Sequence, residues 1–488
     1  MNKFPLPDMF SFSAARVLSL IVVFAVTSGA QTLLTLEKSI EIALSQSYAI
    51  RSAGLSLQSS KKNLEAIEMG MMTSVNLEFD LPRYSNNLKS QFNSVTGAEQ
   101  FYEVGNTQLE GRLYFNQPIV FSNGTFSLIG SIFGRDQFSG DNPVTRDYYS
   151  NFSLRLRQPL FGFNTLSSNL EKAQINLEKS ERNYNRSKSE IVYSVTSAFF
   201  NLYQAKKQLE IAAENVNQSS VSYTTAENKF KAGLIAEVEK LQLEVDLASA
   251  KNDMLSAENS YSELKDNFKL LIGLPLDEDI EPEGEITYTE ILVDEELAVN
   301  SALKNRSEIR NSQLDIELSR LSVEETEARG RISGLLVANY GINKNDEKFN
   351  AIFRNPAEDR GVTFTLSIPV WDWNQNNLQS EAAQANLELS RLTASNQEQS
   401  VRKEITTVLS KIKAAKARVE VLSRSVEVAQ KGFDISMERF KSGNITSFDL
   451  SQQQLRLTNA KLNSLRALID YKLTLADLNR KTLYDFGK

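Results

Sequence analysis

The sequence contains no cysteine and no histidine among its 488 residues. Without cysteine the chain can form no disulfide, no thiolate metal site and no lipidated N-terminal cysteine. Without histidine it lacks the commonest general base and the commonest metal ligand. It also has no Gly-x-Ser-x-Gly motif and no paired-acid signature of a hydrolase cleft. We therefore expect no enzyme activity, no catalytic residues, no cofactor and no metal site.

The chain has no excess of positive charge either, since its net charge is −7. Nucleic-acid binding needs a basic footprint, so we expect no nucleic-acid partner. Acidic residues are concentrated between Asp277 and Glu285. This run lacks the Asp-x-Asp-x-Asp-Gly spacing of a calcium loop, which favours a solvated linker over an ion site.

The first thirty residues have the pattern of a secretory signal. Lys3 and Arg16 provide positive charge, residues 17–26 are apolar, and Ser28-Gly29-Ala30 is a small-residue cleavage site. A buried N-terminal helix is the alternative, which the charged flank disfavours. We expect residues 1–30 to be removed and the mature protein to begin at Gln31. No later stretch has the ~20 apolar residues of a spanning helix.

One stretch occurs twice. Pro159-Leu160-Phe161-Gly162-Phe163-Asn164 reappears as Pro369-Val370-Trp371-Asp372-Trp373-Asn374, 210 residues later. In each copy an alternating apolar and polar run precedes the proline, and a long helical pattern follows it. The stretch therefore predicts a corner where a strand ends and a helix begins. A separation far beyond ~20–50 residues indicates two large halves rather than an array of small repeats.

A long helix is expected after each corner, over residues 167–231 and 375–441. Apolar residues recur in both at heptad steps and in the same phase. At 1.5 Å per residue such a helix would span ~95 Å, which suits a coiled coil or a ring of helices. Each ends in a Phe-x-x-Gly turn, at Phe230 to Gly233 and at Phe440 to Gly443. Return helices are expected over 236–272 and 447–482.

The front of each half has short helices, followed by alternating runs typical of strands. The first repeat is expected to cover residues 31–273, with helices from Leu36 and from Ile50 and strands within 75–160. An acidic linker (274–293) joins it to the second repeat (294–488), which has strands within 334–370. The first half has 49 more residues between its front helix and its corner. These could form an extra hairpin, longer external loops, or a segment lying against the helices.

With these features in this order, the sequence resembles the outer-membrane efflux protein family, the TolC-like channel-tunnels, over essentially the whole mature chain. The resemblance implies a mainly α fold with membrane β structure. Each subunit of a homotrimer would give four strands to a shared 12-stranded β-barrel and its helices to a long periplasmic α-helical barrel. Four strands cannot close a barrel alone, which agrees with trimer formation.

The same resemblance implies a passive export duct of a tripartite efflux or type I secretion system in the outer membrane of a Gram-negative bacterium. Its partners would be outer-membrane lipid, a periplasmic membrane-fusion adaptor and, through the adaptor, an inner-membrane pump of the RND or ABC type. The heptads alone would also permit a soluble periplasmic coiled-coil adaptor or structural protein. The alternating runs favour the channel, because a soluble coiled coil has no use for strands with a lipid-compatible face.

The resemblance places functional residues at the helix turns. The adaptor-contacting tips would be Gly233, Leu234, Ile235, Ala236 and Gly443, Asn444, Ile445, Thr446, Ser447. Glu239 and Asp449 would line the periplasmic aperture as a ring of carboxylates, or would be ordinary first-turn acids favoured by the helix dipole. Gln452 is neutral, so we expect no strong divalent-cation block there.

Aromatic side chains mark the corners. The barrel-to-helix corner residues are Pro159, Phe161, Phe163, Pro369, Trp371 and Trp373. The two tryptophans, with Phe161 and Phe163, could form an interfacial belt or could pack inside the corner.

Overall fold

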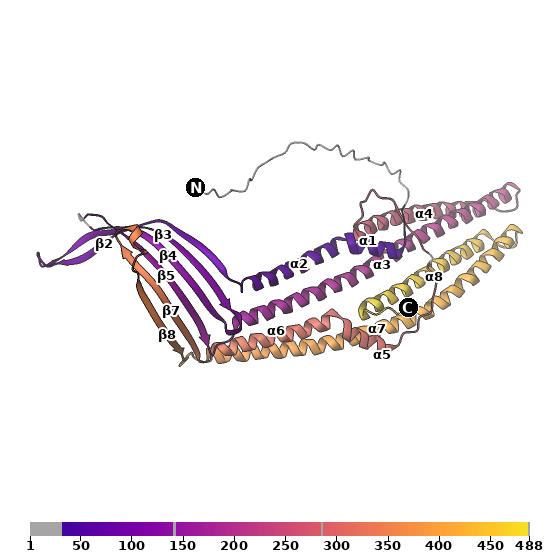
Figure 1. Cartoon of the computed structure of the whole chain (residues 1–488). Coiled ribbons are helices and arrows are strands. Elements are labelled where there is room, and N and C mark those ends of the chain that lie inside the picture. Colours follow the sequence, from indigo (N-terminus) through magenta and orange to yellow (C-terminus); the bar gives the residue numbers. More distant parts are fainter. Residues whose placement is uncertain (1–31, 140–142, 285, 487–488) are drawn as a thin grey trace, which may run out of the picture.

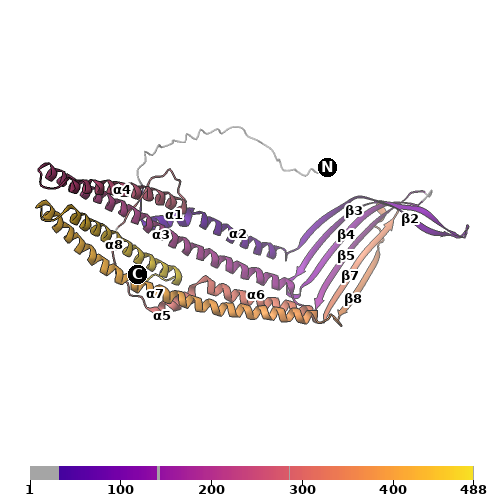
Figure 2. The ribbon, with the colours of Figure 1, turned by 180° about the vertical axis from the view of Figure 1, so that it is seen from behind.

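The computed structural model describes residues 32–139, 143–284 and 286–486. The expected signal segment, residues 1–30, lies outside the described residues. The molecule is elongated, with a β-sheet at one end and a bundle of long helices at the other (Figure 1). Two helical hairpins reach the end farthest from the sheet, and the opposite view shows the same arrangement (Figure 2).

The two halves have matching helices. The first half contains α1 (Leu36–Gln46), α2 (Tyr48–Met69), α3 (Thr165–Lys231) and α4 (Glu237–Ile272). The second contains α5 (Glu295–Asn305), α6 (Ser307–Arg329), α7 (Gln375–Lys441) and α8 (Ser447–Thr482). Helices α3 and α7 both have 67 residues, and α4 and α8 both have 36. The two helical hairpins are therefore equal in length.

The sheet contains six strands rather than four. They are β2 (Ser74–Asn93), β3 (Ala98–Ile119), β4 (Gly124–Ser139), β5 (Thr145–Leu160), β7 (Ser333–Asp346) and β8 (Ala357–Ser367). They lie side by side in the order β2-β3-β4-β5-β7-β8, each antiparallel to the next. The sheet thus has two strands more than the four expected from each subunit. The surplus in the first half adds a hairpin to the same sheet.

The sheet has one apolar face and one largely polar face, as strand alternation requires. Paired residues share a face, and the pairs Leu77 with Leu113 and Leu128 with Leu154 lie on the apolar one. On the polar face Arg112 bridges Glu78, Asp80 and Glu110. Two aromatic rings of β5 lie over glycines of β4. A Cβ on Gly130 would be 3.1 Å from the Phe152 ring, and one on Gly134 would be 3.2 Å from the Tyr148 ring, so a side chain at either position would require the ring to shift.

The expected linker is partly structured. Within it β6 (Ile280–Pro282) pairs in parallel with β1 (Thr32–Leu34). Leu34 and Ile280 are both buried. Two of the linker acids are paired: Glu281 with Lys206 at 2.6 Å, and Asp279 with Lys265. Parallel pairing between segments about 250 residues apart leaves no local sequence signal.

Two equivalent cores stabilise the middle of the molecule. In the first half, Ile191, Val195 and Leu202 of α3 pack against α1 and the end of α4. In the second half, the residues 210 positions later, Val401, Ile405 and Ile412, pack against α5 and α8. Burial of each such side chain contributes roughly 1.5–3 kcal/mol. Among the described residues, no helix is both long and apolar enough to cross a membrane.

Candidate functional site

The two helix turns have the same backbone geometry. Gly233 and Gly443 have positive φ angles of 71° and 78°. In each turn the next residue donates its N–H to a carbonyl five residues back, from Leu234 to Lys229 and from Asn444 to Arg439. Glycine is required at both positions because the left-handed conformation disfavours a side chain.

The nine expected tip residues divide into two sets. Ile235, Ile445 and Ser447 are turned inward: the two isoleucines pack against a cluster that includes Phe440, Leu450 and Leu457, and Ser447 is buried. The others are exposed at the end of the molecule, namely Gly233, Leu234, Ala236, Gly443, Asn444 and Thr446. Sequence reasoning missed two exposed apolar neighbours in the first turns of the return helices, Val238 and Phe448. Val238 and Phe448 are 210 residues apart, and this repeat spacing could have identified both as tip residues.

The aperture candidates differ in their hydrogen bonding. Asp449 forms a capping box with Thr446: its carboxylate accepts from the Thr446 N–H at 3.2 Å, and its own N–H donates to the Thr446 hydroxyl at 3.2 Å. This bonding gives Asp449 a structural role at the start of α8. Glu239 is half-buried and makes no side-chain hydrogen bond or ion pair with the described residues. Gln452 is exposed.

Polar side chains join the two hairpins just behind the turns. Gln454 of α8 is buried and donates to Asn215 Oδ1 at 2.7 Å and to Ser219 Oγ at 2.9 Å, both on α3. Ser451 donates to Asp246 of α4 at 2.5 Å. Helix α8 therefore packs against the first hairpin, while α4 and α7 lie at the two outer flanks of the pair.

The repeated Phe-x-x-Gly turns have different surroundings. The Phe440 ring is only 1% exposed, and Lys229 Nζ lies 4.6 Å from its centroid and donates to its carbonyl. By the 210-residue repeat, Arg439 corresponds to Lys229 and Phe230 corresponds to Phe440. Arg439 and Phe230 do not meet within the chain: Phe230 is 37% exposed, and Arg439 is exposed without a side-chain hydrogen bond or ion pair to the described residues. The Phe230 ring instead has Lys240 Nζ of its own chain 5.7 Å from its centroid. The contact between a cation of one hairpin and the phenylalanine of the other is thus made once within the chain, and its copy is not.

The corners share a sequence but not a conformation. In the first, Asn164 accepts from the Ser167 N–H at 3.0 Å and caps α3, and Phe161 has a positive φ. In the second, positive φ angles fall at Trp373 and Asn374, and Asp372 accepts from the N–H groups of Asn374 and Asn376. Asp372 provides this capping carboxylate where the first copy has Gly162.

Exposed aromatic rings cluster at these corners. Trp371 and Trp373 are 76% and 84% exposed and contact each other edge to face, with ring centroids 5.4 Å apart. Phe161 is also exposed, whereas Phe163 is half-buried. The turn of the extra hairpin adds Phe121, which is 88% exposed and which sequence reasoning missed. Tryptophan with an exposed ring at such a level is typical of an aromatic girdle at a membrane interface.

The turn of the extra hairpin is anchored to the first corner. The short helix η1 (Val120–Ser122) ends at Asn123, whose side-chain oxygen accepts from the Leu166 N–H at 3.4 Å and whose amide donates to the Phe163 carbonyl at 3.3 Å. Asn164 donates back to the Val120 carbonyl at 2.7 Å. The added hairpin is therefore joined to the start of α3.

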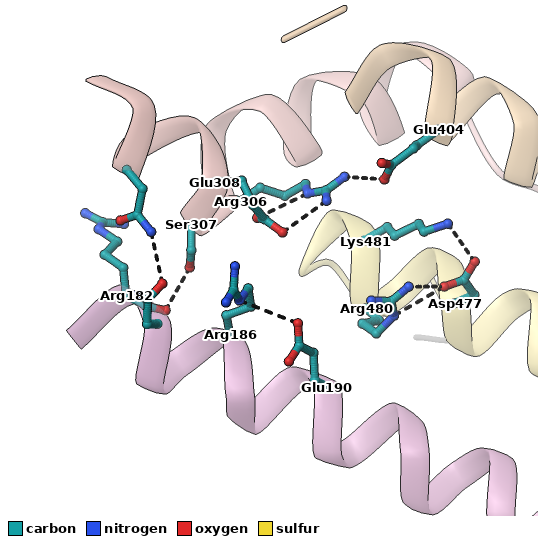
Figure 3. A network of polar contacts seen from close by, with 12 residues as sticks. Arg182, Arg186, Glu190, Arg306, Ser307, Glu308, Glu404, Asp477, Arg480 and Lys481 are labelled. Atoms are coloured by element: carbon teal, nitrogen blue, oxygen red, sulfur yellow. Dashed lines mark hydrogen bonds and ion pairs between the residues drawn. The ribbon is translucent and has the colours of Figure 1, made fainter. Parts of the chain in front are cut away.

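Ion pairs hold the halves together nearer the sheet. Arg310 of α6 donates two hydrogen bonds to Glu178 of α3, at 2.8 and 3.0 Å, and holds the pKa of that carboxyl below its ordinary value. Lys172 of α3 donates one hydrogen bond to Glu325 of α6 at 2.7 Å and likewise holds the pKa of that carboxyl below its ordinary value. Figure 3 shows the neighbouring network, in which Arg306 bridges Glu308 and Glu404, and Ser307 donates to the Arg182 carbonyl. These contacts link α3, α6 and α7.

Comparison with known proteins identifies the architecture. The model of the family described as "Outer membrane efflux protein" matches residues 39–274 and 298–482. Nodulation protein T of Rhizobium leguminosarum bv. trifolii is 19% identical over 326 residues, which are 66% of this chain and 68% of that protein.

Solved structures share the fold. The Campylobacter jejuni CmeC outer membrane channel is 13% identical, with a TM-score of 0.69 over 93% of this chain and 87% of that one. The open state of the Neisseria gonorrhoeae MtrE outer membrane channel is 16% identical, with a TM-score of 0.66 over 92% and 88%. The predicted resemblance, and the class of a helical tunnel with a β domain in two repeated halves, are confirmed. Since the family model spans both halves, the chain belongs to the outer membrane efflux protein family, as an outer-membrane channel component.

Proposed function

We propose that three copies of this chain form a passive export duct from the periplasm to the exterior, and that the two helix turns of each copy dock a periplasmic adaptor. The sheet lies in the outer membrane and the hairpins extend into the periplasm. An inner-membrane pump of the RND or ABC type, reached through the adaptor, supplies the energy. The duct itself performs no chemistry.

The observation that carries this proposal is the half-made contact at the turns. Inside the chain the first hairpin meets the second through Lys229 and Phe440. The equivalent residues, Arg439 and Phe230, do not meet within the chain; Arg439 is exposed, and Phe230 is partly exposed beside Lys240. A neighbouring copy brings its Arg439 to Phe230 and repeats the internal contact. Repetition around an axis closes a ring in which every hairpin has two neighbours.

The outer flank of α7 supports the same arrangement. It carries exposed apolar residues along its length, including Leu392, Val421 and Ile435. An exposed apolar stripe on a helix of this length marks an interaction surface. A partner helix from the next copy would cover it.

The turns suit an adaptor because they combine rigidity with exposed apolar groups. The glycine caps and the capping box fix the backbone. Leu234, Val238 and Phe448 present apolar surface at the end of the molecule. A soluble coiled-coil protein, the alternative role, has no use for the six-stranded sheet with its apolar face.

The test uses substitutions at the turns. Gly443→Trp places a side chain where φ is 78°, and Leu234→Asp with Phe448→Asp places charge on the exposed apolar groups. Each is expected to abolish export while the protein still reaches the outer membrane as a trimer. Leu292→Asp, at an exposed linker residue away from the turns, is the control and should export normally. Normal export by the tip variants would overturn adaptor docking at the turns, and recovery in the soluble periplasm would overturn the duct.

A further inference from the structure

The six-stranded sheet has two open edges. Within the part of the chain that the structure describes, β2 pairs only with β3 and β8 pairs only with β7. Every residue of β8 is exposed, and so is nearly every residue of β2. Open edges of this length invite pairing with another chain, and soluble proteins block them. Here the edges carry exposed apolar residues, including Phe79 and Phe364.

We propose that β8 of one copy pairs antiparallel with β2 of the next, so that three copies close an 18-stranded barrel. This inference rests on the trimer of the proposed function and departs from the 12 strands that the family resemblance implies. The partner is a second copy of this chain, and the interaction surface is the strand edge.

Strand direction and side-chain pattern fix the pairing. Strand β2 begins at Ser74, soon after α2, and β8 ends at Ser367, shortly before α7. The two strands thus run in opposite directions relative to the helices. Placing Ser74 opposite Ser367 aligns their helix-proximal ends. Successive residues then pair as Val75 with Leu366, Asn76 with Thr365, Leu77 with Phe364, Glu78 with Thr363, and Phe79 with Val362.

This register matches apolar residues with apolar residues on one face and polar residues with polar residues on the other. Such cross-strand pairs are the unit of sheet stability. A shift by one residue would put the apolar side chains of one strand beside the polar side chains of the other. Pro82 and the irregularity between Asp80 and Arg83 lie just beyond the seam. Proline has no N–H to donate, so its position at the end of the pairing costs no ladder bond.

The same register gives an ordinary barrel geometry. Across the sheet, residues opposite each other in register connect Ser74 with Asn116, Ser127, Arg155, Asn339 and finally Gly361. Gly361 is six residues from Ser367, so each copy advances the register by six residues before the next β2 begins. Three copies with six residues each give a barrel shear of about 18, equal to the number of strands. With about 3.4 Å per residue and about 4.8 Å between strands, the tilt is about 35°, within the range of membrane barrels.

An 18-stranded barrel is about 1.5 times as wide as one with 12 strands, because diameter grows nearly linearly with strand number. It falls in the range of barrels that leave an aqueous channel. The polar face, with Arg112 and its three carboxylate partners, would line this water. The passage through the membrane would then be wide, and the helix turns rather than the barrel would limit the size of the cargo.

The absence of native cysteine permits a direct cross-linking test. Asn76→Cys combined with Thr365→Cys places thiols on opposite residues of the proposed seam. Opposite residues in antiparallel strands have Cα atoms about 4.5–5.5 Å apart, within disulfide range. Oxidation of the trimer in outer membranes is expected to give covalent dimers and trimers on a non-reducing gel. Each single variant should give none.

The competing arrangement leaves β2 and β3 outside the barrel and brings β8 to the β4 of the next copy. Ser127→Cys with Thr365→Cys and Ser127→Cys with Thr363→Cys test that contact. The 18-stranded barrel is overturned if a trimeric protein that exports normally cross-links only through these two pairs, or through none of the pairs tested. The export duct of the proposed function would still stand in that case. Absence of any trimer from the outer membrane instead overturns the proposed function, and the seam with it.

Discussion

Phe230→Ala should weaken the trimer while leaving the single chain folded. The ring is 37% exposed in the isolated chain, so most of it is buried there and the substitution also lowers the stability of the hairpin. In the ring of three copies, the exposed part would be covered by the neighbouring hairpin. A phenylalanine buries roughly 150–250 Å², so that part amounts to roughly 55–90 Å² and ~2 kcal/mol per interface.

Three such interfaces give about 6 kcal/mol for the trimer, or roughly a 10⁴-fold change in its association constant. The measurement is the trimer fraction against protein concentration in a mild detergent, by analytical ultracentrifugation. Circular dichroism checks that the helices persist. Arg439→Gln, which removes the neighbour's cation expected beside the Phe230 ring in addition to Lys240 of the same chain, should shift the trimer in the same direction by about 0.5–1 kcal/mol per interface.

Phe440→Ala is the matched comparison, because the same residue type is buried inside one chain. It should destabilise the fold of the hairpins by about 3–5 kcal/mol. A well-folded Phe230→Ala protein whose trimer is as stable as the wild type would refute the reasoning that the open contact is completed by a neighbour.

Three further predictions concern other parts of the molecule. Gln454→Leu should leave Asn215 and Ser219 without their buried partner and lower the unfolding temperature in thermal melts, with a cost of about 1–3 kcal/mol; a neutral result would contradict a structural role for this link. Acidification should weaken the contact of α3 with α6, because the pKa of Glu178 is held by Arg310 below its ordinary value of 4.5. The stability it contributes is therefore present above that value and lost as the pH falls further, and the drop in unfolding temperature should be smaller in Arg310→Met; both side chains are about one-third exposed, so the effect is small. Trp371→Ala with Trp373→Ala should reduce insertion into lipid vesicles without changing helix content, whereas Leu292→Ala should not; equal insertion by all three proteins would argue against an aromatic girdle.

Much of the helical architecture could be predicted from the sequence because it is encoded locally. Heptad spacing specifies a helix, and the glycines of the Phe-x-x-Gly turns end it where the left-handed conformation is needed. The observed helices α3 and α7, Thr165–Lys231 and Gln375–Lys441, begin and end within two residues of the expected ranges. Residue alternation likewise marked the strands and their apolar face.

Strand number in the sheet could not be predicted in the same way. Alternation shows that a segment is a strand but not which other strands it joins, and the runs around β3 and β4 were compatible with three arrangements. Pairing depends on contacts between distant segments, such as Asn123 with the start of α3. The parallel pair β1 and β6 was missed for the same reason.

The sequence by itself determined that the chain has two repeated halves, each with a strand-to-helix corner, a long helix and a glycine turn. The tertiary structure decided where those halves differ. Phe440 is buried by its neighbouring hairpin, whereas the equivalent Phe230 is 37% exposed. The physical reason is that a sequence repeat specifies the same local backbone geometry twice, whereas the burial of a side chain depends on which elements pack against it. Within a single chain, each helical hairpin packs against the other on one side only.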